Sequence, residues 1–268
     1  MGRKELIACF EDTQRMALGP LSAQTAAACS RQRVYEGGFV AAVLPLHEQD
    51  CPCLVEAASS LQSARVHRGG GRVAVLNFAN PVNPGGGVTR GARAQEEDLC
   101  RCSSLYPCLC DGRVADAYYG YHRALRAPEG SDRLIYTRDV PVFKEGDPVP
   151  QLLAMQDWFN VDIITCAAPY LPGMTGVKPA PLQELFKRRI RCILEAAIDN
   201  RAEVLILGAF GCGAFGNDPR VIASFFKEVL DSAEFKNAFR EVVFAIIEDH
   251  NSNGRNFKAF QSVFENNK

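Results

Sequence analysis

Two apolar segments that each run directly into a glycine-rich stretch constrain this chain most strongly. The first, residues 72–79 (RVAVLNFA), leads into NPVNPGGG, and the second, residues 203–207 (EVLIL), leads into GAFGCGAFGNDP. Near-continuous apolar character is expected of strands that are covered on both faces of a sheet. In open α/β sheets, ligands lie outside the carboxyl ends of the strands, so the two loops predict a binding cleft there.

Helical and strand periodicities alternate along the rest of the chain. Helices are expected at 3–17, 22–33, 60–68, from near 92, and at 114–125, 181–198, 219–230 and 256–264. Further strands are expected at 133–136, 140–143, 161–167 and 242–247, and a β-rich stretch at 39–46. The alternation predicts an α/β sandwich with helices on both faces of the sheet. Because no linker or composition shift divides the sequence, we expect a single domain over residues 1–268, with 1–35 as an N-terminal helical extension.

Composition and charge exclude several classes of protein. The 30 Lys and Arg residues nearly cancel the 31 Asp and Glu residues, for a net charge of −1. A chain that coats nucleic acid through its phosphates normally carries a basic excess or a basic run, and neither is present. No apolar run approaches the roughly 20 residues of a membrane span. The first residues (MGRKELIACFEDTQRM) carry charges throughout and lack a signal-peptide core, so a cytoplasmic location is expected.

The two glycine-rich loops are suited to binding an anion. Glycine lets the backbone turn its N–H groups toward a phosphate, and the N-terminus of a following helix adds a favourable dipole. Neither loop matches the P-loop pattern GxxxxGK[ST]. Gly211-x-Gly213-x-x-Gly216 lacks an acidic residue at Rossmann spacing, which argues against a dinucleotide oxidoreductase. A single glycine motif is equally compatible with a tight turn, so the diphosphate interpretation depends on there being two loops.

A carboxylate pair follows the first loop, because seven residues after Gly87 the sequence reads Gln95-Glu96-Glu97. Adjacent residues of a helix point about 100° apart, so Glu96 and Glu97 cannot flank one bond as the two carboxyls of an ordinary glycosidase do. One carboxyl beside a diphosphate suits cleavage of an acetal whose leaving group must be protonated. On its own, QEE is typical of a solvent-exposed helix face, and its spacing from GGG is what favours a function.

GGG, seven residues and QEE together resemble the GGG-x(6–8)-QEE signature of poly(ADP-ribose) glycohydrolases. Residues 77–84 (NFANPVNP) resemble the substrate loop of the bacterial-type members, and 211–216 (GCGAFG) resemble the family's diphosphate loop. The similarity also extends through 99–107, 140–143 and 165–169. The resemblance implies a macrodomain, a three-layer α/β/α sandwich with a mixed sheet, with the N-terminal helical extension added.

The resemblance also implies residue roles. Glu97 is the catalytic acid that protonates the leaving ribose oxygen and then acts as base for the attacking water, and Glu96 contacts the leaving-side ribose or helps to place the bond. Gln95 supports the loop, Phe215 packs on the distal ribose, and either Asn80 or Asn83 binds that ribose. The substrate-binding residues implied are Asn80, Asn83, Gly85, Gly86, Gly87, Val88, Gln95, Gly211, Cys212, Gly213, Ala214, Phe215 and Gly216. No metal and no cofactor is implied.

The implied function is hydrolysis of the ribose–ribose O-glycosidic bond of poly(ADP-ribose) on modified proteins, from the chain end, with release of ADP-ribose. One alternative is a non-catalytic ADP-ribose-binding macrodomain, which needs both glycine loops but not QEE. Another is a mono-ADP-ribosyl hydrolase that acts on modified protein or nucleic acid, since it breaks an acetal at the same ribose carbon. The intact QEE favours an enzyme. We expect a monomer that binds neither nucleic acid nor membrane directly.

Eleven cysteines are unusual for a chain of this length. A disulfide framework is typical of short secreted chains, so reduced thiols are expected here. Cys100, Cys102, Cys108 and Cys110 form C-x-C-x5-C-x-C, which lacks the C-x-x-C spacing of common zinc sites. We therefore expect ordinary thiols, with a zinc or redox role as the alternative. Cys212 is interpreted as a small packing residue rather than a reactive thiol. Asp12 and Thr13 are interpreted as exposed polar surface.

Overall fold

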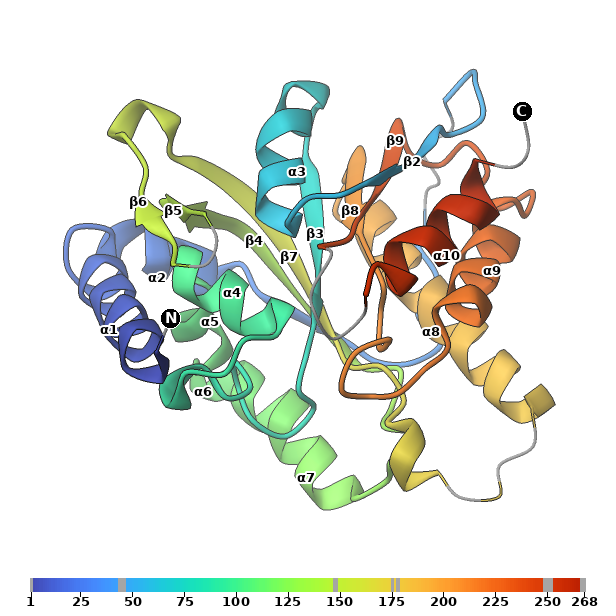
Figure 1. Cartoon of the computed structure of the whole chain (residues 1–268), viewed down its shortest axis with the longest axis horizontal. Helices are drawn as coiled ribbons and strands as arrows, with labels where there is room; N and C mark the ends of the chain where they lie inside the picture. Colours follow the sequence, from blue (N-terminus) through green and yellow to red (C-terminus); the bar gives the residue numbers. More distant parts are fainter. Residues whose placement is uncertain are drawn as a thin grey trace. The chain divides into compact units, whose positions relative to one another are not determined.

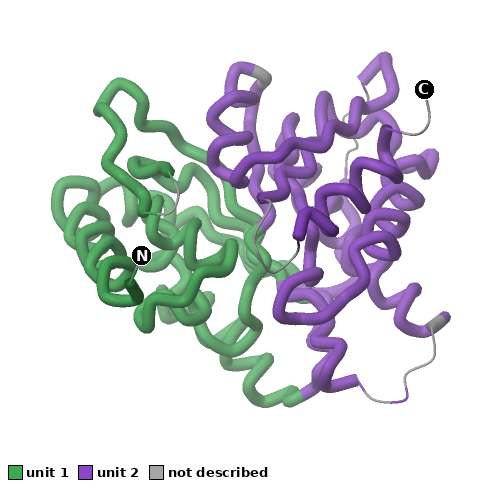
Figure 2. Tube along the Cα trace, viewed as in Figure 1, with its two compact units in different colours: residues 1–35, 77–126, 133–166 green, residues 36–76, 127–132, 167–268 purple. Residues whose placement is uncertain are grey.

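The computed structural model describes residues 2–42, 47–146, 149–174, 176, 179–247 and 253–265. The chain divides into two compact units, each assembled from several segments (Figure 2). Unit 1 comprises residues 1–35, 77–126 and 133–166, and unit 2 comprises 36–76, 127–132 and 167–268. The chain passes from unit 2 into unit 1 within strand β3 (Val73–Phe78). A single domain over residues 1–268 stays a prediction.

Unit 1 is built on antiparallel strands. Strand β4 (Leu134–Val142) pairs on one side with β1 (Arg33–Tyr35) and on the other with β7 (Phe159–Cys166). A short hairpin of β5 (Lys144–Glu145) and β6 (Gln151–Leu152) follows β4. The sequence predicts two strands at 133–136 and 140–143, but the structure has one strand with a bulge between Thr137 and Val140. Within the bulge Asp139 has a φ of +54°, and its N–H donates to Asp162 Oδ1 at 2.9 Å.

The helices of unit 1 are drawn in blue to green in Figure 1. Their bounds are Arg3–Leu18 (α1), Ser22–Ser30 (α2), Gln95–Cys102 (α4), Leu105–Leu109 (α5), Gly112–Val114 (α6) and Tyr121–Leu125 (α7), with 3-10 turns at Val88–Arg90 and Met155–Asp157. The predicted helix 114–125 is helical throughout, but its middle, Ala115–Gly120, is a π-helix. Helix α1 buries Leu6, Cys9, Phe10, Thr13 and Ala17, the i, i+3, i+4 stripe of an amphipathic helix.

Unit 2 is built on parallel strands. Strand β8 (Val204–Leu207) pairs in parallel with β3 and with β9 (Glu241–Ala245), and β9 pairs in parallel with β2 (Cys53–Glu56). Every residue of β8 is buried, as required of a strand covered on both faces. Strand β2 has no apolar alternation, and its strand conformation comes from pairing with β9 rather than from its own sequence.

The helices of unit 2 are α3 (Ser60–His67), α8 (Pro179–Asp199), α9 (Pro219–Leu230) and α10 (Arg255–Phe264), with 3-10 turns at Arg68–Gly70 and Leu171–Gly173. Helix α9 has the predicted bounds, 219–230: the Asp218 side chain accepts the N–H of Arg220 at 2.9 Å and so caps the helix, and Pro219 takes the first helical position. Helix α9 packs against both α8 and α10. In the core of unit 2, the ring of Phe244 meets those of Phe226 and Phe260.

In the described residues, seven strands form one mixed sheet in the order β1-β4-β7-β3-β8-β9-β2. This sheet, with its helices, confirms the predicted α/β class. Two local expectations are wrong. Residues 39–42 of the β-rich stretch form no strand, while 43–46 lie outside the described residues. Helix α2 ends at Ser30 rather than 33, because Arg33–Tyr35 pair with β4 instead. No helix in the described ranges is both long enough and apolar enough to cross a membrane.

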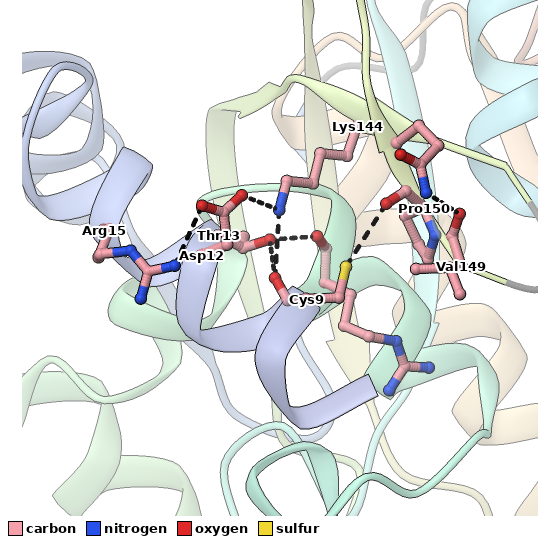
Figure 3. Close-up of polar contacts among 9 residues, drawn as sticks. Cys9, Asp12, Thr13, Arg15, Lys144, Val149 and Pro150 are labelled. Atoms are coloured by element: carbon pink, nitrogen blue, oxygen red, sulfur yellow. Dashed lines mark hydrogen bonds and ion pairs between the residues drawn. The ribbon is translucent and has the colours of Figure 1, made fainter. Parts of the chain in front are cut away.

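Helix α1 is fastened to the neighbouring elements of unit 1 by polar contacts (Figure 3). The buried Lys144 ammonium donates to the Cys9 carbonyl at 3.1 Å and to Asp12 Oδ2 at 2.7 Å. Thr13 Oγ1 lies 3.0 Å from the Cys9 carbonyl oxygen and 2.5 Å from that of Arg101, near the end of α4. The interpretation of Thr13 as exposed surface is therefore wrong, because its hydroxyl is used inside the protein.

Thr13→Val is expected to destabilise unit 1. The last carbonyls of a helix have no partner within the helix, and Thr13 supplies one to Arg101 from α1. Valine has the same shape but no hydroxyl, so a buried carbonyl loses its donor, which costs about 1–3 kcal/mol. Urea unfolding measures the change, with Thr13→Ser as the control that keeps the hydroxyl. Equal destabilisation by both variants would contradict the hydrogen-bond argument.

Candidate active site

The loop after β3 is folded by the side chain of Asn80. Its Oδ1 accepts the backbone N–H groups of Val82 and Asn83, both at 2.9 Å. Asn83 is exposed, and its side chain makes no hydrogen bond within the described ranges. Of the two asparagines that the sequence leaves open as ribose ligands, Asn80 uses its amide oxygen to fold the loop, whereas Asn83 has both its amide oxygen and its amide nitrogen available to a ligand.

Two consecutive residues of the GGG stretch have the left-handed backbone conformation. Gly85 and Gly86 have φ values of +64° and +59°, conformations that other L residues rarely adopt. The Gly86 N–H donates to the Asn83 carbonyl at 3.0 Å, and the Val88 N–H to the Gly85 carbonyl at 3.1 Å. A Cβ on Gly86 would lie 2.4 Å from Glu97 Oε1 and 3.1 Å from Glu96 Oε2. The glycine is what allows both carboxylates to approach the turn.

Glu97 joins the glycine turn to the start of α4. It is the third residue of α4, and its Oε2 accepts the Ala94 N–H at 2.8 Å, the position of a capping-box glutamate. Its Oε1 accepts the Gly87 N–H at 2.7 Å. The side chain is buried, with 6% of its surface exposed. Each carboxylate oxygen has a second lone pair, so the two N–H contacts leave Glu97 able to bind a further donor.

Glu96 is buried more deeply and holds the preceding loop. Its Oε2 accepts the Asn80 N–H at 2.7 Å, and its Oε1 lies 3.4 Å from Asn77 Nδ2. Burial, together with the neighbouring Glu97, raises the pKa of Glu96 to about 8, against the N–H groups that favour its ionised form. Glu96 is therefore neutral at pH 7.

Two further side chains brace this loop. Gln95 Oε1 accepts the Phe78 N–H at 2.9 Å, so Gln95 lies against the end of β3. Asn77, fully buried in β3, places its Nδ2 between Glu96 Oε1 and Thr165 Oγ1 at 3.4 and 3.3 Å. No separate role was predicted for Asn77 from the sequence. A polar residue inside an otherwise apolar strand, just before the loop, is the signal that could have found it.

Glu96→Gln is expected to change how stability depends on pH. Between pH 4.5, the ordinary pKa of the group, and about pH 8, the Glu96 carboxyl is ionised in the unfolded chain and protonated in the folded chain. The contribution of Glu96 to stability therefore falls as pH rises through this range. Glutamine does not titrate. Wild type should therefore lose stability relative to Glu96→Gln between about pH 5 and about pH 8, measured by urea unfolding. A constant difference across this range would show that Glu96 is ionised in the folded chain.

The second glycine loop lies in unit 2 and is organised by Asn217, another residue that sequence reasoning missed as part of the site. Asn217 is buried, and its Nδ2 donates to the carbonyls of Gly211 at 2.9 Å and Pro169 at 3.0 Å. Gly211 and Gly216 have φ values of +75° and +73°. A Cβ on Gly211 would lie 2.6 Å from Asn217 Nδ2 and 2.6 Å from the Ala168 Cβ. The turn therefore requires glycine at this position.

The two loops differ in the backbone N–H groups they offer. Those of Gly86, Gly87 and Val88 are already taken by protein acceptors, which differs from the expectation that the first loop presents free groups. Those of Gly213, Ala214 and Phe215 donate to no acceptor in the part of the chain that the structure describes. Three successive N–H groups on this partly exposed loop therefore have no protein acceptor there and are candidate donors to an anion.

The side chains of the second loop are apolar or neutral. The ring of Phe215 meets Tyr170 edge-on, with the centroids 5.6 Å apart. Burial raises the pKa of Cys212 to about 12, so this thiol stays protonated at neutral pH. A protonated thiol is a poor nucleophile, which favours the interpretation of Cys212 as a packing residue.

The structure brings one group of predicted site residues together in unit 1: Asn80, Asn83, Gly85, Gly86, Gly87, Val88, Gln95, Glu96 and Glu97. The second group, Gly211, Cys212, Gly213, Ala214, Phe215 and Gly216, forms one loop of unit 2. Within the described ranges, no three His, Cys, Asp or Glu side chains are grouped so as to hold a metal ion. The roles of both groups of predicted site residues toward substrate stay predictions.

Comparison with known proteins identifies the family. The model of the microbial-type PARG catalytic domain matches residues 11–145. The crystal structure of poly(ADP-ribose) glycohydrolase (PARG) from Thermomonospora curvata is 31% identical, with a TM-score of 0.85 over 97% of this chain and 99% of that chain. The chain belongs to the microbial-type PARG family. Among curated proteins, none matches this chain.

Other PARG structures give the same result. The Thermomonospora curvata enzyme bound to the inhibitor ADP-HPD is 31% identical, with a TM-score of 0.83 over 96% of this chain and 98% of that one. Deinococcus radiodurans PARG in complex with ADP-ribose is 31% identical, with a TM-score of 0.77 over 90% of this chain and 97% of that chain. The predicted family, its macrodomain-like fold and the hydrolysis of poly(ADP-ribose) are thereby confirmed.

Proposed function

We propose that this enzyme releases ADP-ribose from the ends of poly(ADP-ribose) chains on modified proteins, with Glu97 as general acid and base. The observation that carries the proposal is the position of the Glu97 carboxyl. It is buried against Gly86 and fixed by the N–H groups of Gly87 and Ala94. Such fixing gives one carboxyl a defined direction, which proton transfer to a leaving oxygen requires.

The reaction needs one proton and one water. Glu97 gives its proton to the ribose oxygen that leaves as the glycosidic bond breaks, and positive charge develops on the other ribose as in other glycoside hydrolyses. Glu97, now ionised, takes a proton from the water that attacks this ribose carbon. The carboxyl is then protonated again, and both products carry hydroxyl groups. Neutral Glu96 holds the loop without placing its own negative charge near an anionic substrate.

Each unit has its own groups that suit part of ADP-ribose. In unit 2, the unpaired N–H groups of Gly213, Ala214 and Phe215 provide donors for a diphosphate, and the Phe215 ring can pack on a sugar. In unit 1, the exposed Asn83 amide can hydrogen-bond a ribose hydroxyl. The Deinococcus radiodurans and Thermomonospora curvata relatives, solved with ADP-ribose and with ADP-HPD, support the same ligand class for this chain.

The test compares two substrates under one set of conditions. The protein is incubated with poly(ADP-ribose) and, separately, with mono-ADP-ribosylated protein, and released ADP-ribose is followed by chromatography. Release from the polymer as single ADP-ribose units supports action at chain ends, whereas early release of oligomers would mean internal cleavage. Release from the mono-modified protein alone would overturn the preference for polymer. Calorimetry should show one ADP-ribose bound per chain, and no binding would contradict the binding site.

A further inference from the structure

One thiol of the cysteine-rich segment after α4 lies close to a thiol of helix α2. Cys29, at the end of α2, and Cys108, in α5, are 79 residues apart in sequence, yet their Sγ atoms lie 3.5 Å apart. No disulfide joins them. The two sulfurs are thus close enough for a hydrogen bond and need only a small displacement to form a covalent bond, whose S–S length is about 2.05 Å.

The two thiols of this pair differ in access and in acidity. Cys108 is buried, whereas Cys29 is partly exposed, so a small reagent in solvent reaches Cys29 first. The hydrogen bond from Cys108 lowers the pKa of Cys29, helped by the Arg113 guanidinium and opposed by burial and by Asp111. The same contact and burial raise the pKa of Cys108. Cys29 is therefore the nucleophilic member of the pair, since the thiolate is the reactive form.

Helix α5 connects this pair to the glycine turn of the active site. Tyr106, two residues before Cys108, packs so closely on Gly85 that a Cβ there would lie 2.7 Å from its Cδ2. On its other side, the Tyr106 ring meets Phe10 of α1 edge-on, with the centroids 4.9 Å apart. A displacement of α5 therefore moves a ring that sits directly on the backbone of the GGG turn.

We propose that Cys29 is an oxidation site for hydroperoxides, that Cys108 is its resolving thiol, and that the disulfide between them inhibits hydrolysis by shifting Tyr106 against Gly85. The Cys29 thiolate attacks one peroxide oxygen, the O–O bond breaks, and a sulfenic acid and, for hydrogen peroxide, hydroxide form. The Cys108 thiol then attacks the Cys29 sulfur, an S–S bond forms, and water leaves. Two thiols are oxidised and one peroxide is reduced.

The wild-type protein itself tests the covalent step. Fully reduced protein is titrated with hydrogen peroxide, the remaining thiols are blocked, and disulfide-linked peptides are mapped by mass spectrometry without reduction. We expect a Cys29–Cys108 link at the lowest effective peroxide level, with a several-fold loss of ADP-ribose release that dithiothreitol reverses. Oxidation of other cysteines without this link would overturn the proposal. So would the link without loss of turnover.

Variants separate this pair from the other cysteines. The readout is the ratio of turnover after peroxide to turnover before it, which cancels differences in basal activity. Cys29→Ser should keep a ratio near one, and Cys29→Ala is the second variant in case the serine form is unstable. Cys51→Ser is the matched control, because Cys51 is partly exposed like Cys29 but lies in unit 2, so the pair stays intact, and this variant should remain sensitive. Sensitivity retained in Cys29→Ser and Cys29→Ala would overturn the assignment.

The effect on turnover depends on the proposed function, but formation of the disulfide does not. Reduced protein that releases no ADP-ribose from any substrate would count against the proposed function. Peptide mapping would still decide whether Cys29 and Cys108 form the link. The two failures are thereby distinguishable.

Discussion

Glu97→Gln is expected to lower the rate of ADP-ribose release by about 10²–10⁴-fold, the usual loss when general acid–base help is removed. Glutamine matches glutamate in size but has no acid proton to give. Its amide oxygen can still accept the N–H of the capping residue Ala94, but its NH2 group cannot accept the N–H of Gly87, so one of the two structural contacts is kept. The loss should therefore fall on turnover, since the proton is needed only in the transition state.

Binding and turnover are measured separately for this variant. Calorimetry with ADP-ribose should give an affinity within a few-fold of wild type, while chromatography follows release from poly(ADP-ribose). Glu96→Gln is the matched control, because its carboxyl bonds to Asn80 and Asn77 rather than to the turn at Gly87. We expect a smaller loss of turnover in Glu96→Gln. Near-normal turnover in Glu97→Gln would show that another group is the acid.

The sequence predicted the parts of the site that depend on local pattern. The two strand–glycine loop units and the carboxylates on the following helix are visible in the order of residues, because apolar runs, glycines and helix starts are local signals. The start of α4 at Gln95 rather than near 92 was not predicted. It depends on the Gly87–Ala92 turn and on the contact of Glu97 with Ala94, which join residues of different elements.

The remaining features depend on contacts that no local pattern contains. The raised pKa of Glu96 follows from its burial. The pairing of Cys29 with Cys108 requires α2 and α5 to pack together. Strand β2 was missed for the same reason, since it is a strand only through β9. Tertiary packing, rather than propensity, determines each of these features.

Gly86→Ala is expected to impair both folding and catalysis while every catalytic group is retained. The position has a φ of +59°, which costs an L residue about 1–2 kcal/mol. The added methyl would lie 2.4 Å from Glu97 Oε1, so either the turn or the carboxylate must move. A displacement of a catalytic group by about 1 Å typically costs about 10²-fold in rate. We expect a turnover loss of about this size and a lower free energy of unfolding.

Gly112→Ala is the control, because a Cβ there meets nothing within 4 Å and its φ is not positive. It should change neither turnover nor unfolding appreciably. The comparison with Glu97→Gln then separates geometry from chemistry. Glu97→Gln keeps ADP-ribose affinity, whereas Gly86→Ala should weaken it, because the turn that carries Val88 and follows Asn83 is displaced. If Gly86→Ala retained wild-type turnover and affinity, the close approach of Glu97 to this turn would not be required for hydrolysis.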